Sequence, residues 1–194
     1  AIEGTTIFVE EQTQGRGRSG KEWFCKNGKG LLLTVVLRPV IQTENSYLLM
    51  VITAVAIVQT IRDMFKLPVD IDWPNDLVIN NKKLGGIIVE TRDHTEQLRD
   101  YIVGIGINVN LKKHELPDQI DQPATSLAIE KETLIDRTNF AKALLQNLDS
   151  WYLILKEKRY DHIVDKWQEF CMNIGRRVNV RNTRKEFEGV FLGI

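Results

Sequence analysis

The sequence predicts an α+β protein with a mixed, largely antiparallel sheet and helices packed against that sheet. Strand-like segments follow one another in hairpin-like succession along most of the chain. Only three helical segments interrupt them, one early and two late. A parallel sheet would need a crossover, usually a helix, between successive strands, so this order favours antiparallel pairing.

The first half of the chain alternates turns with short apolar segments, which predict strands. Residues 6–10 and 30–38 are β-branched and apolar, and Pro39 closes the second segment. Residues 44–65 carry apolar side chains at helical spacing, and their first half is apolar nearly all round. A helix that is apolar on every side is a buried one, so we expect this helix at the centre of the core.

The later segments continue the pattern. Further strands are predicted over residues 69–73, 77–79, 84–90 and 101–110. The turn at residues 80–82 (Asn-Asn-Lys) indicates a hairpin between two of them. Asp136 is the predicted N-cap of a helix that runs through Leu155, and another helix covers about residues 161–171.

The last twenty residues change character. Two strand-like segments, 177–181 and 187–192, flank a polar turn at residues 182–185, which predicts a β-hairpin. We therefore expect one domain over residues 1–173 and the beginning of a small all-β domain over residues 174–194. Because both ends of the sequence lie close to strand patterns, we also expect the sequence to be a piece of a longer protein.

Composition and charge limit the class of protein. Of the 194 residues 43% are hydrophobic and 27% charged, and 26 basic residues balance 26 acidic ones, as in a folded globular protein. A neutral body lacks the basic surface that broad nucleic-acid binding needs. Cys25 and Cys171 are far apart and form no CxxC motif, which favours a reducing, cytoplasmic setting and disfavours zinc. Neither a signal peptide nor a membrane span is expected, since the longest uncharged apolar run, residues 47–61, is shorter than about 18 residues.

A glycine-rich basic loop follows the first strand. Residues 15–20 match the dinucleotide-binding fingerprint, but no helical pattern follows them to place a helix N-terminus at a pyrophosphate. The P-loop pattern fails as well, because Glu22 stands where a hydroxyl should bind magnesium. What remains is Arg16 and Arg18 between glycines, with Trp23 nearby, which suits binding of a phosphate or carboxylate beside a ring. The alternative is a solvated surface loop with Trp23 in the core.

Three further motifs combine polar residues with glycines. Residues 73–76 (Trp-Pro-Asn-Asp) end one strand, and residues 83–86 (Lys-Leu-Gly-Gly) begin another. Glycines 104 and 106 share one side of a strand, so we expect a large group to approach that side. Each motif has a plain structural explanation, namely a turn, a solvated hairpin lysine such as Lys82, or a strand packed tightly on a helix. All of them together are hard to explain by structure alone.

In combination, order and spacing these motifs resemble the biotin protein ligases, over almost the whole chain. The resemblance implies a catalytic domain related to class II aminoacyl-tRNA synthetases, followed by a small SH3-like β domain. It also implies the activity, which is ATP- and Mg²⁺-dependent activation of biotin to biotinyl-5'-AMP and transfer of biotin to a lysine of a biotin carboxyl carrier protein. The expected protein is a cytoplasmic ligase that binds no membrane and, having no helix-turn-helix in this sequence, no nucleic acid. A homodimer is compatible with the resemblance.

The resemblance also implies the roles of particular residues. Those expected to bind biotin are Gln12, Gly15, Arg16, Gly17, Arg18, Lys83, Gly86, Gly104 and Gly106. Those expected to bind ATP or the adenylate are Trp23, Asn75, Asp76 and Asn108, and Asp76 is also the expected magnesium ligand. The catalytic residues are expected to be Lys83, Arg16 and Arg18.

Two features depart from the family pattern. The Ser-Thr-Asn segment that precedes the basic loop in the family lies outside this sequence, and Asp72 replaces a lysine that commonly precedes the Trp-Pro-Asn-Asp motif. Three alternatives therefore stay open: a lipoate-type ligase of the same fold, a non-catalytic sensor of biotin or its adenylate, and an RNA-binding module. The neutral net charge speaks against the last of these.

Overall fold

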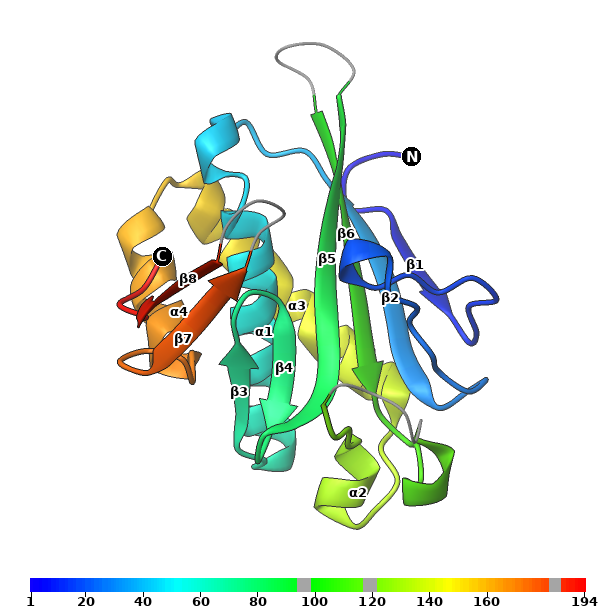
Figure 1. The fold of residues 1–194 in the computed structure, drawn as a ribbon. Coiled ribbons are helices and arrows are strands. Elements are labelled where there is room, and N and C mark those ends of the chain that lie inside the picture. The colour runs from blue at the N-terminus through cyan, green and yellow to red at the C-terminus, as the bar shows by residue number, and fades with distance from the viewer. Residues whose placement is uncertain (94–98, 117–121, 182–185) are drawn as a thin grey trace.

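The computed structural model describes residues 1–93, 99–116, 122–181 and 186–194, which form a six-stranded sheet with helices packed on it (Figure 1). All paired strands of this sheet are antiparallel, and their order is β1-β2-β6-β5-β4-β3. The strands are β1 (Thr6–Val9), β2 (Gly30–Leu37), β3 (Val69–Asp72), β4 (Asp76–Ile79), β5 (Lys82–Asp93) and β6 (Arg99–Asn108). The predicted α+β class and the largely antiparallel sheet are confirmed.

The three long helices, α1 (Leu48–Phe65), α3 (Arg137–Lys156) and α4 (Tyr160–Phe170), lie where helical spacing predicts them. A fourth, short helix is α2 (Leu127–Lys131). The Oδ1 atom of Asp136 accepts a hydrogen bond of 3.0 Å from the backbone N–H of Asn139, so the predicted N-cap of α3 is confirmed. Helix α2 was not predicted, because five residues are too few to show a period.

Helix α1 forms the centre of the hydrophobic core, as predicted. It packs between the sheet and helices α3 and α4 (Figure 1). The stretch Thr43–Phe65 is long and apolar enough to cross a membrane, yet 72% of its apolar window is buried inside this fold. Burial in the core therefore accounts for its apolar character. The α-helix itself starts at Leu48, after a short 3-10 turn at Thr43–Asn45 that the sequence pattern merged with it.

Alternation along the strands gives the sheet two different faces. The face that meets the helices carries apolar side chains, including Leu33 on β2, Ile87 on β5 and Ile105 on β6. The residues between them point to the opposite face, because successive side chains of a strand alternate. On that face the register places Thr34 beside Gly104, and the loop between β1 and β2 crosses in front of it (Figure 1).

The C-terminal residues form a separate two-stranded sheet of β7 (Arg177–Arg181) and β8 (Glu186–Val190). The two strands of the predicted hairpin are therefore present, and the turn predicted at residues 182–185 lies outside the described residues. The sheet sits beside α4 and near β3 (Figure 1). Phe191, just after β8, packs with Trp73 and Trp167, with ring centroids 5.4 and 6.4 Å apart.

Candidate active site

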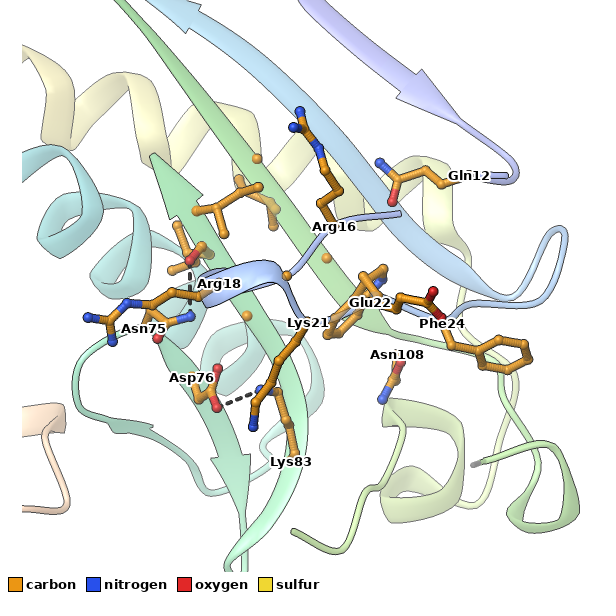
Figure 2. A pocket seen from close by; sticks show the side chains of 18 of the residues that line it. Gln12, Arg16, Arg18, Lys21, Glu22, Phe24, Asn75, Asp76, Lys83 and Asn108 are labelled. Atoms are coloured by element: carbon orange, nitrogen blue, oxygen red, sulfur yellow. Dashed lines mark hydrogen bonds and ion pairs between the residues drawn. The ribbon is translucent and has the colours of Figure 1, made fainter. Parts of the chain in front are cut away.

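A cavity of about 1080 Å³ lies on the face of the sheet that the loop crosses. Its walls come from loop residues between 12 and 24, from strands β2, β5 and β6, from residues 74–76 and from residues 122 and 124. Figure 2 shows that Lys21 of the loop, Asp76 of β4 and Lys83 of β5 point toward one another. A cavity of this size holds a ligand larger than a single nucleoside, or two smaller ligands side by side.

The floor of the cavity is made of glycines on neighbouring strands. Gly86 of β5 is directly opposite Gly106 of β6, and Ile88 is opposite Gly104. Residues that are directly opposite in an antiparallel pair share one face of the sheet. The glycines therefore let neighbouring side chains lie close to the sheet, since a Cβ atom would lie 2.8 Å from Cγ1 of Ile88 at Gly104 and 3.2 Å from Oδ1 of Asp76 at Gly86. Ile88 and Ile102 line the cavity beside these glycines.

The large group that lies against Gly106 of β6 is Trp23, whereas Gly104 is approached by Ile88 of β5. A Cβ atom placed on Gly106 would lie 2.7 Å from Cε2 of the Trp23 indole, so only glycine leaves room for this ring. The backbone that carries this ring is held in the loop, because the N–H of Trp23 donates to the carbonyl of Gly15 at 2.9 Å. A Cβ on Gly15 would lie 2.4 Å from the Trp23 carbonyl oxygen. Gly15 therefore allows the two sides of the loop to lie close together at Trp23. It is not among the residues that line the cavity.

The Trp23 contact gives a first prediction. Replacing Gly106 with alanine should lower the free energy of unfolding by about 1–3 kcal/mol, because the added methyl group overpacks the indole. The measurement is urea denaturation followed by circular dichroism. Gly189→Ala is the matched control, since nothing lies within 4 Å of a Cβ at that strand position, and its change should stay within about 0.5 kcal/mol. Equal stability of the two variants would contradict the proposed packing.

Lys83 reaches the cavity because of a β-bulge. Leu77 of β4 is opposite Gly85, but the next residue, Val78, is opposite Lys83, so Leu84 is an extra residue on β5. In regular alternation Lys83 would share the helix-facing side with Gly85 and Ile87. The extra residue reverses the alternation, as bulges do, so that Leu84 is buried in the core and Lys83 lines the cavity.

The side chain of Lys83 forms an ion pair in the cavity. Its Nζ atom lies 2.6 Å from Oδ2 of Asp76, and both side chains remain partly exposed, at 31% and 23%. Figure 2 shows this pair on the floor side of the cavity, with Lys21 of the loop extending toward it. An ion pair that is open to a cavity can rearrange around an incoming anion, since its two charges are not sealed from solvent. The ion pair therefore positions the Lys83 ammonium group in the cavity, and the group stays accessible to an anion.

The turn that carries Asp76 is fastened to strand β5. Asn75 and Ile87 are joined twice, because the Ile87 N–H donates to the Asn75 carbonyl at 3.0 Å and the Asn75 Nδ2 donates to the Ile87 carbonyl at 3.2 Å. The Trp73–Pro74 peptide bond in this turn is cis. The paired strands β3 and β4 continue from the turn with Asp72 opposite Asp76. The turn thus places an amide and a carboxylate at the wall of the cavity.

Residues 123–126, for which the sequence predicts no role, support both Lys83 and Asn108. The Lys83 N–H donates to the carbonyl of Pro123 at 2.7 Å, and the Thr125 N–H donates back to the Lys83 carbonyl at 2.9 Å. The Nδ2 atom of Asn108 donates to the Thr125 carbonyl at 3.0 Å, which orients the buried amide. Ser126 then caps α2 through the N–H of Ile129. Residues 123–126 therefore form a rigid base for two residues at the cavity.

The two arginines of the loop point to different ends of the cavity. Arg18 begins a 3-10 turn (Arg18–Gly20) and lies near Asn75, whereas Arg16 points away from this region (Figure 2). Arg16 is 3.6 Å from Glu90, with three quarters of its side chain exposed. The backbone of the loop is closed on itself, since the Gly17 N–H donates to the Lys21 carbonyl at 2.6 Å. The structure thus brings Arg18, but not Arg16, to the side of the Lys83–Asp76 pair.

Nearly all of the residues predicted to bind substrates line this cavity. Twelve of the thirteen line one cavity: Gln12, Arg16, Gly17, Arg18, Trp23, Asn75, Asp76, Lys83, Gly86, Gly104, Gly106 and Asn108. The exception is Gly15, for the reason given above. Residues that line the cavity without having been predicted include Phe24, Ile88, Glu90 and Gln122. Strand alternation could have found Ile88 and Glu90, since both share a face with Gly86.

Neither cysteine lines the cavity. Burial raises the pKa of Cys25 to about 11, and it raises the pKa of Cys171 as well. Both thiols are therefore protonated at neutral pH and are poor nucleophiles. Cys25 packs against Gly30, where a Cβ would lie 2.4 Å from its Sγ. Within residues 1–93, 99–116, 122–181 and 186–194, no group of three His, Cys, Asp or Glu side chains could hold a metal ion by itself.

Fold and cavity together define an α+β domain with a cavity large enough for a small molecule. The cavity joins an apolar floor to a polar end with an amide, a carboxylate and cationic side chains. The chain matches the biotin/lipoate A/B protein ligase family over residues 2–108. It therefore belongs to the biotin/lipoate A/B protein ligase family.

Similar proteins agree with this assignment. The bifunctional ligase/repressor BirA of Bacillus subtilis is 34% identical over 194 residues, which is all of this chain and 60% of that protein. The biotin–[acetyl-CoA-carboxylase] ligase of Mycobacterium tuberculosis is 27% identical, over 92% of this chain and 65% of that protein. The structure of the Aquifex aeolicus biotin protein ligase in complex with biotin and ATP has a TM-score of 0.87 at 27% identity, covering 100% of this chain and 79% of that one. The fold is thus that of a biotin protein ligase, and the chain spans about 60% of the first two proteins.

Proposed function

We propose that this chain is the catalytic part of a biotin protein ligase, which joins biotin to a lysine of a biotin carboxyl carrier protein at the expense of ATP. One observation carries the proposal. A glycine floor with apolar edges and the Lys83–Asp76 pair share one cavity beside a loop that carries Arg18. Family membership supports the proposal, as do relatives whose names state this activity.

The two regions of the cavity suit the two small substrates. Ile88 and Ile102 offer an apolar wall to a fused ring and its alkyl chain. We propose that biotin lies there, with its carboxylate directed toward Lys83, and that the phosphates of ATP lie by Arg18. The indole of Trp23 presents an aromatic surface on which adenine would pack.

The first proposed step makes a mixed anhydride. A carboxylate oxygen of biotin attacks the α-phosphorus of ATP, and the bond from that phosphorus to pyrophosphate breaks, so that biotinyl-5'-AMP and pyrophosphate form. The obstacle is that two anions must meet. Lys83 and Arg18 provide positive charge that offsets this repulsion and stabilises the transition state. Holding the carboxylate and the phosphorus in line supplies a further large part of the rate.

A magnesium ion would accompany the nucleotide, and the oxygen donors at the polar end fit one. Mg²⁺ prefers oxygen ligands, commonly one or two carboxylates together with waters and substrate phosphates. Asp76 offers a carboxylate, and Asn108 offers the amide oxygen opposite its bonded nitrogen. Asp76 would hold the ion, and Asn108 would contact the phosphates beside it; the bound ion would neutralise phosphate charge.

The second proposed step transfers biotin to the carrier. The neutral amine of a carrier lysine attacks the carbonyl carbon of the anhydride, the bond to the phosphate oxygen breaks, and AMP leaves. The attacking nitrogen releases a proton as the amide forms. Lys83 would stabilise the negative charge that develops on the carbonyl oxygen. Exclusion of water by the loop would protect the anhydride from hydrolysis until the carrier arrives.

The proposal extends to the organisation and setting of the protein. Residues 1–173 would form the catalytic domain, and residues 174–194 would begin an SH3-like β domain. The carrier would be the biotin carboxyl carrier domain of a biotin-dependent carboxylase. Two buried, protonated cysteines with no disulfide suit a reducing cytoplasm.

A single assay tests this function. The chain is incubated with ATP, Mg²⁺, biotin and a purified carrier domain, and biotinylated carrier is detected with an avidin probe. We expect labelling that requires ATP and the acceptor lysine of the carrier. Tight binding of biotin without labelling would point to a sensor, and labelling with lipoate in place of biotin would point to the lipoate-type enzyme. Either outcome would overturn the proposal.

A further inference from the structure

The turn at residues 73–75 is held from a second side, by Asn173. The Oδ1 atom of Asn173 accepts a hydrogen bond of 2.7 Å from the backbone N–H of Trp73. Its Nδ2 atom donates to Oδ1 of Asp72 at 3.0 Å. One amide side chain, a hundred residues away in sequence, thus joins both residues that lead into the turn.

These contacts belong to a continuous attachment of the C-terminal segment to strand β3. Cys171 forms a parallel bridge with Ile71, and the Met172 N–H donates to the Ile71 carbonyl at 2.9 Å. Residues 171–173 thus lie along the end of β3, and Phe191 covers the Trp73 ring. None of residues 171–173 lines the cavity. Any effect of Asn173 on the site must therefore pass through the turn.

The position of the turn matters because its residues form the polar end of the cavity. On one side Asn75 is joined twice to Ile87 of β5. On the other side Asn173 fixes Asp72 and Trp73. Asp76 follows directly and meets Lys83 at 2.6 Å. The pairing of Asp76 with Gly86 and with Asp72 holds its backbone in the sheet, and Asn173 adds an attachment on the Asp72 side that fixes the orientation of the turn.

The same contact explains the acidic residue at position 72. A lysine there would present a donor to the Nδ2 donor of Asn173, and the two could not form a hydrogen bond. The carboxylate of Asp72 is an acceptor, so it pairs with the amide while the amide oxygen remains bonded to Trp73. Asp72 and Asn173 are thus matched to each other.

We infer that Asn173 is a positioning residue for the phosphate end of the active site, acting through Asp72 and the backbone of Trp73. The inference rests on the proposed function, since it concerns how the chain binds ATP. It predicts that damage at Asn173 weakens the interaction with ATP and spares biotin, because the biotin region is built on β5 and β6 and not on the turn.

A charge-pattern swap tests the pairing. In Asn173→Asp a carboxylate faces the carboxylate of Asp72, and the donor to Asp72 is lost. The double variant Asp72→Asn with Asn173→Asp restores every hydrogen bond with the roles reversed, because the new amide at 72 donates and the new carboxylate at 173 accepts from both partners. Asn179→Ala is the matched control, since Asn179 lies in the same C-terminal segment and its Nδ2 donates to the exposed side chain of Glu186 at 2.7 Å.

Two measurements separate a positioning role from a general loss of structure. The first is KM and kcat for ATP, measured as biotin-dependent release of pyrophosphate. The second is the dissociation constants of ATP and of biotin, measured by calorimetry. We expect Asn173→Asp to raise the KM and dissociation constant of ATP about tenfold, the effect of losing one hydrogen bond and gaining a repulsion. Biotin affinity should stay within about twofold. The swap should return the ATP values to within about threefold of the wild type, and Asn179→Ala should leave them unchanged.

The outcomes are distinguishable. Unchanged ATP affinity in Asn173→Asp, or equal loss of ATP and biotin affinity, would overturn the inference. If Asn173→Asp does not fold, the swap decides, and a folded swap with weak ATP binding would overturn it as well. If the wild-type chain binds ATP and biotin but releases no pyrophosphate, the proposed function fails, while the ATP dissociation constants of the variants still decide the role of Asn173.

Discussion

Replacing Lys83 with alanine should lower the rate of biotin transfer by roughly 10²–10³-fold, the usual cost of removing one group that stabilises a developing charge. The Nζ atom of Lys83 lies 2.6 Å from Asp76 at the floor of the cavity. Its loss removes a cation and leaves the carboxylate of Asp76 unpaired against the anionic substrates. Both proposed steps depend on the same cation, so adenylate formation and transfer should both slow. Pyrophosphate release and carrier labelling measure the two steps separately.

The neighbouring residue supplies a matched control for Lys83. Lys82 carries the same side chain one position earlier but lies outside the cavity, where its Nζ is 3.4 Å from Glu130. Lys82→Ala should therefore retain activity within about twofold, as exposed substitutions away from a site do. Lys83→Arg keeps the charge but not the compact ammonium group, and its activity should lie between the other two. Similar activities for Lys82→Ala and Lys83→Ala would disprove the assigned role.

Replacing Arg18 with alanine is expected to have the second-largest effect, a loss of roughly 10–100-fold in kcat/KM for ATP, because one charge-assisted contact to phosphate disappears. Figure 2 places Arg18 at the end of the cavity where Asn75 lies. The loop backbone should be preserved, since its hydrogen bonds run between main-chain groups of Gly17, Lys21, Gly15 and Trp23. Steady-state kinetics with varied ATP at saturating biotin measures the effect.

Two comparisons make the Arg18 prediction specific. Arg159→Ala removes an exposed arginine that pairs with Glu157 outside the cavity, and it should leave kcat/KM unchanged. Arg16→Ala should cost less than Arg18→Ala, because Arg16 is 75% exposed and pairs with Glu90 at the other end of the cavity. A larger loss for Arg16 than for Arg18 would mean that the loop rearranges on binding and reverses these roles.

Much of the fold follows from local pattern. The apolar run of α1 and the hairpin signals around residues 80–82 could be interpreted directly, because burial and turn conformation act over a few residues. Asn80 and Asn81 have positive φ angles of 51° and 61°, which asparagine tolerates better than most residues. Helix α2 could not be predicted, because five residues are too few to show a helical repeat of apolar side chains and its formation depends on a cap and on packing.

The sequence was enough to predict which residues belong to the candidate site, but not how they are arranged in space. Glycines two apart share a face of a strand, so an approaching group could be expected above residues 104 and 106. That this group is the protein's own Trp23 could not be foreseen, because the contact depends on how a loop folds back over the sheet. The roles of residues 123–126 and of Asn173 also escaped, since both act through backbone contacts between segments far apart in sequence.

The extra residue in strand β5 has a consequence for transplanting or comparing such sites. Lys82 and Lys83 carry the same side chain, and the bulge at Leu84 places Lys83 and not Lys82 at the cavity. A designer who copied these strands into a regular sheet would bury the ammonium group of Lys83 among apolar side chains, where an unpaired charge is strongly disfavoured. A deletion of Leu84, by contrast, would remove the bulge and keep Lys83 on the cavity face, because Lys83 would then alternate directly with Gly85. The access of this lysine to the cavity thus depends on an irregularity in the hydrogen-bond ladder of β5.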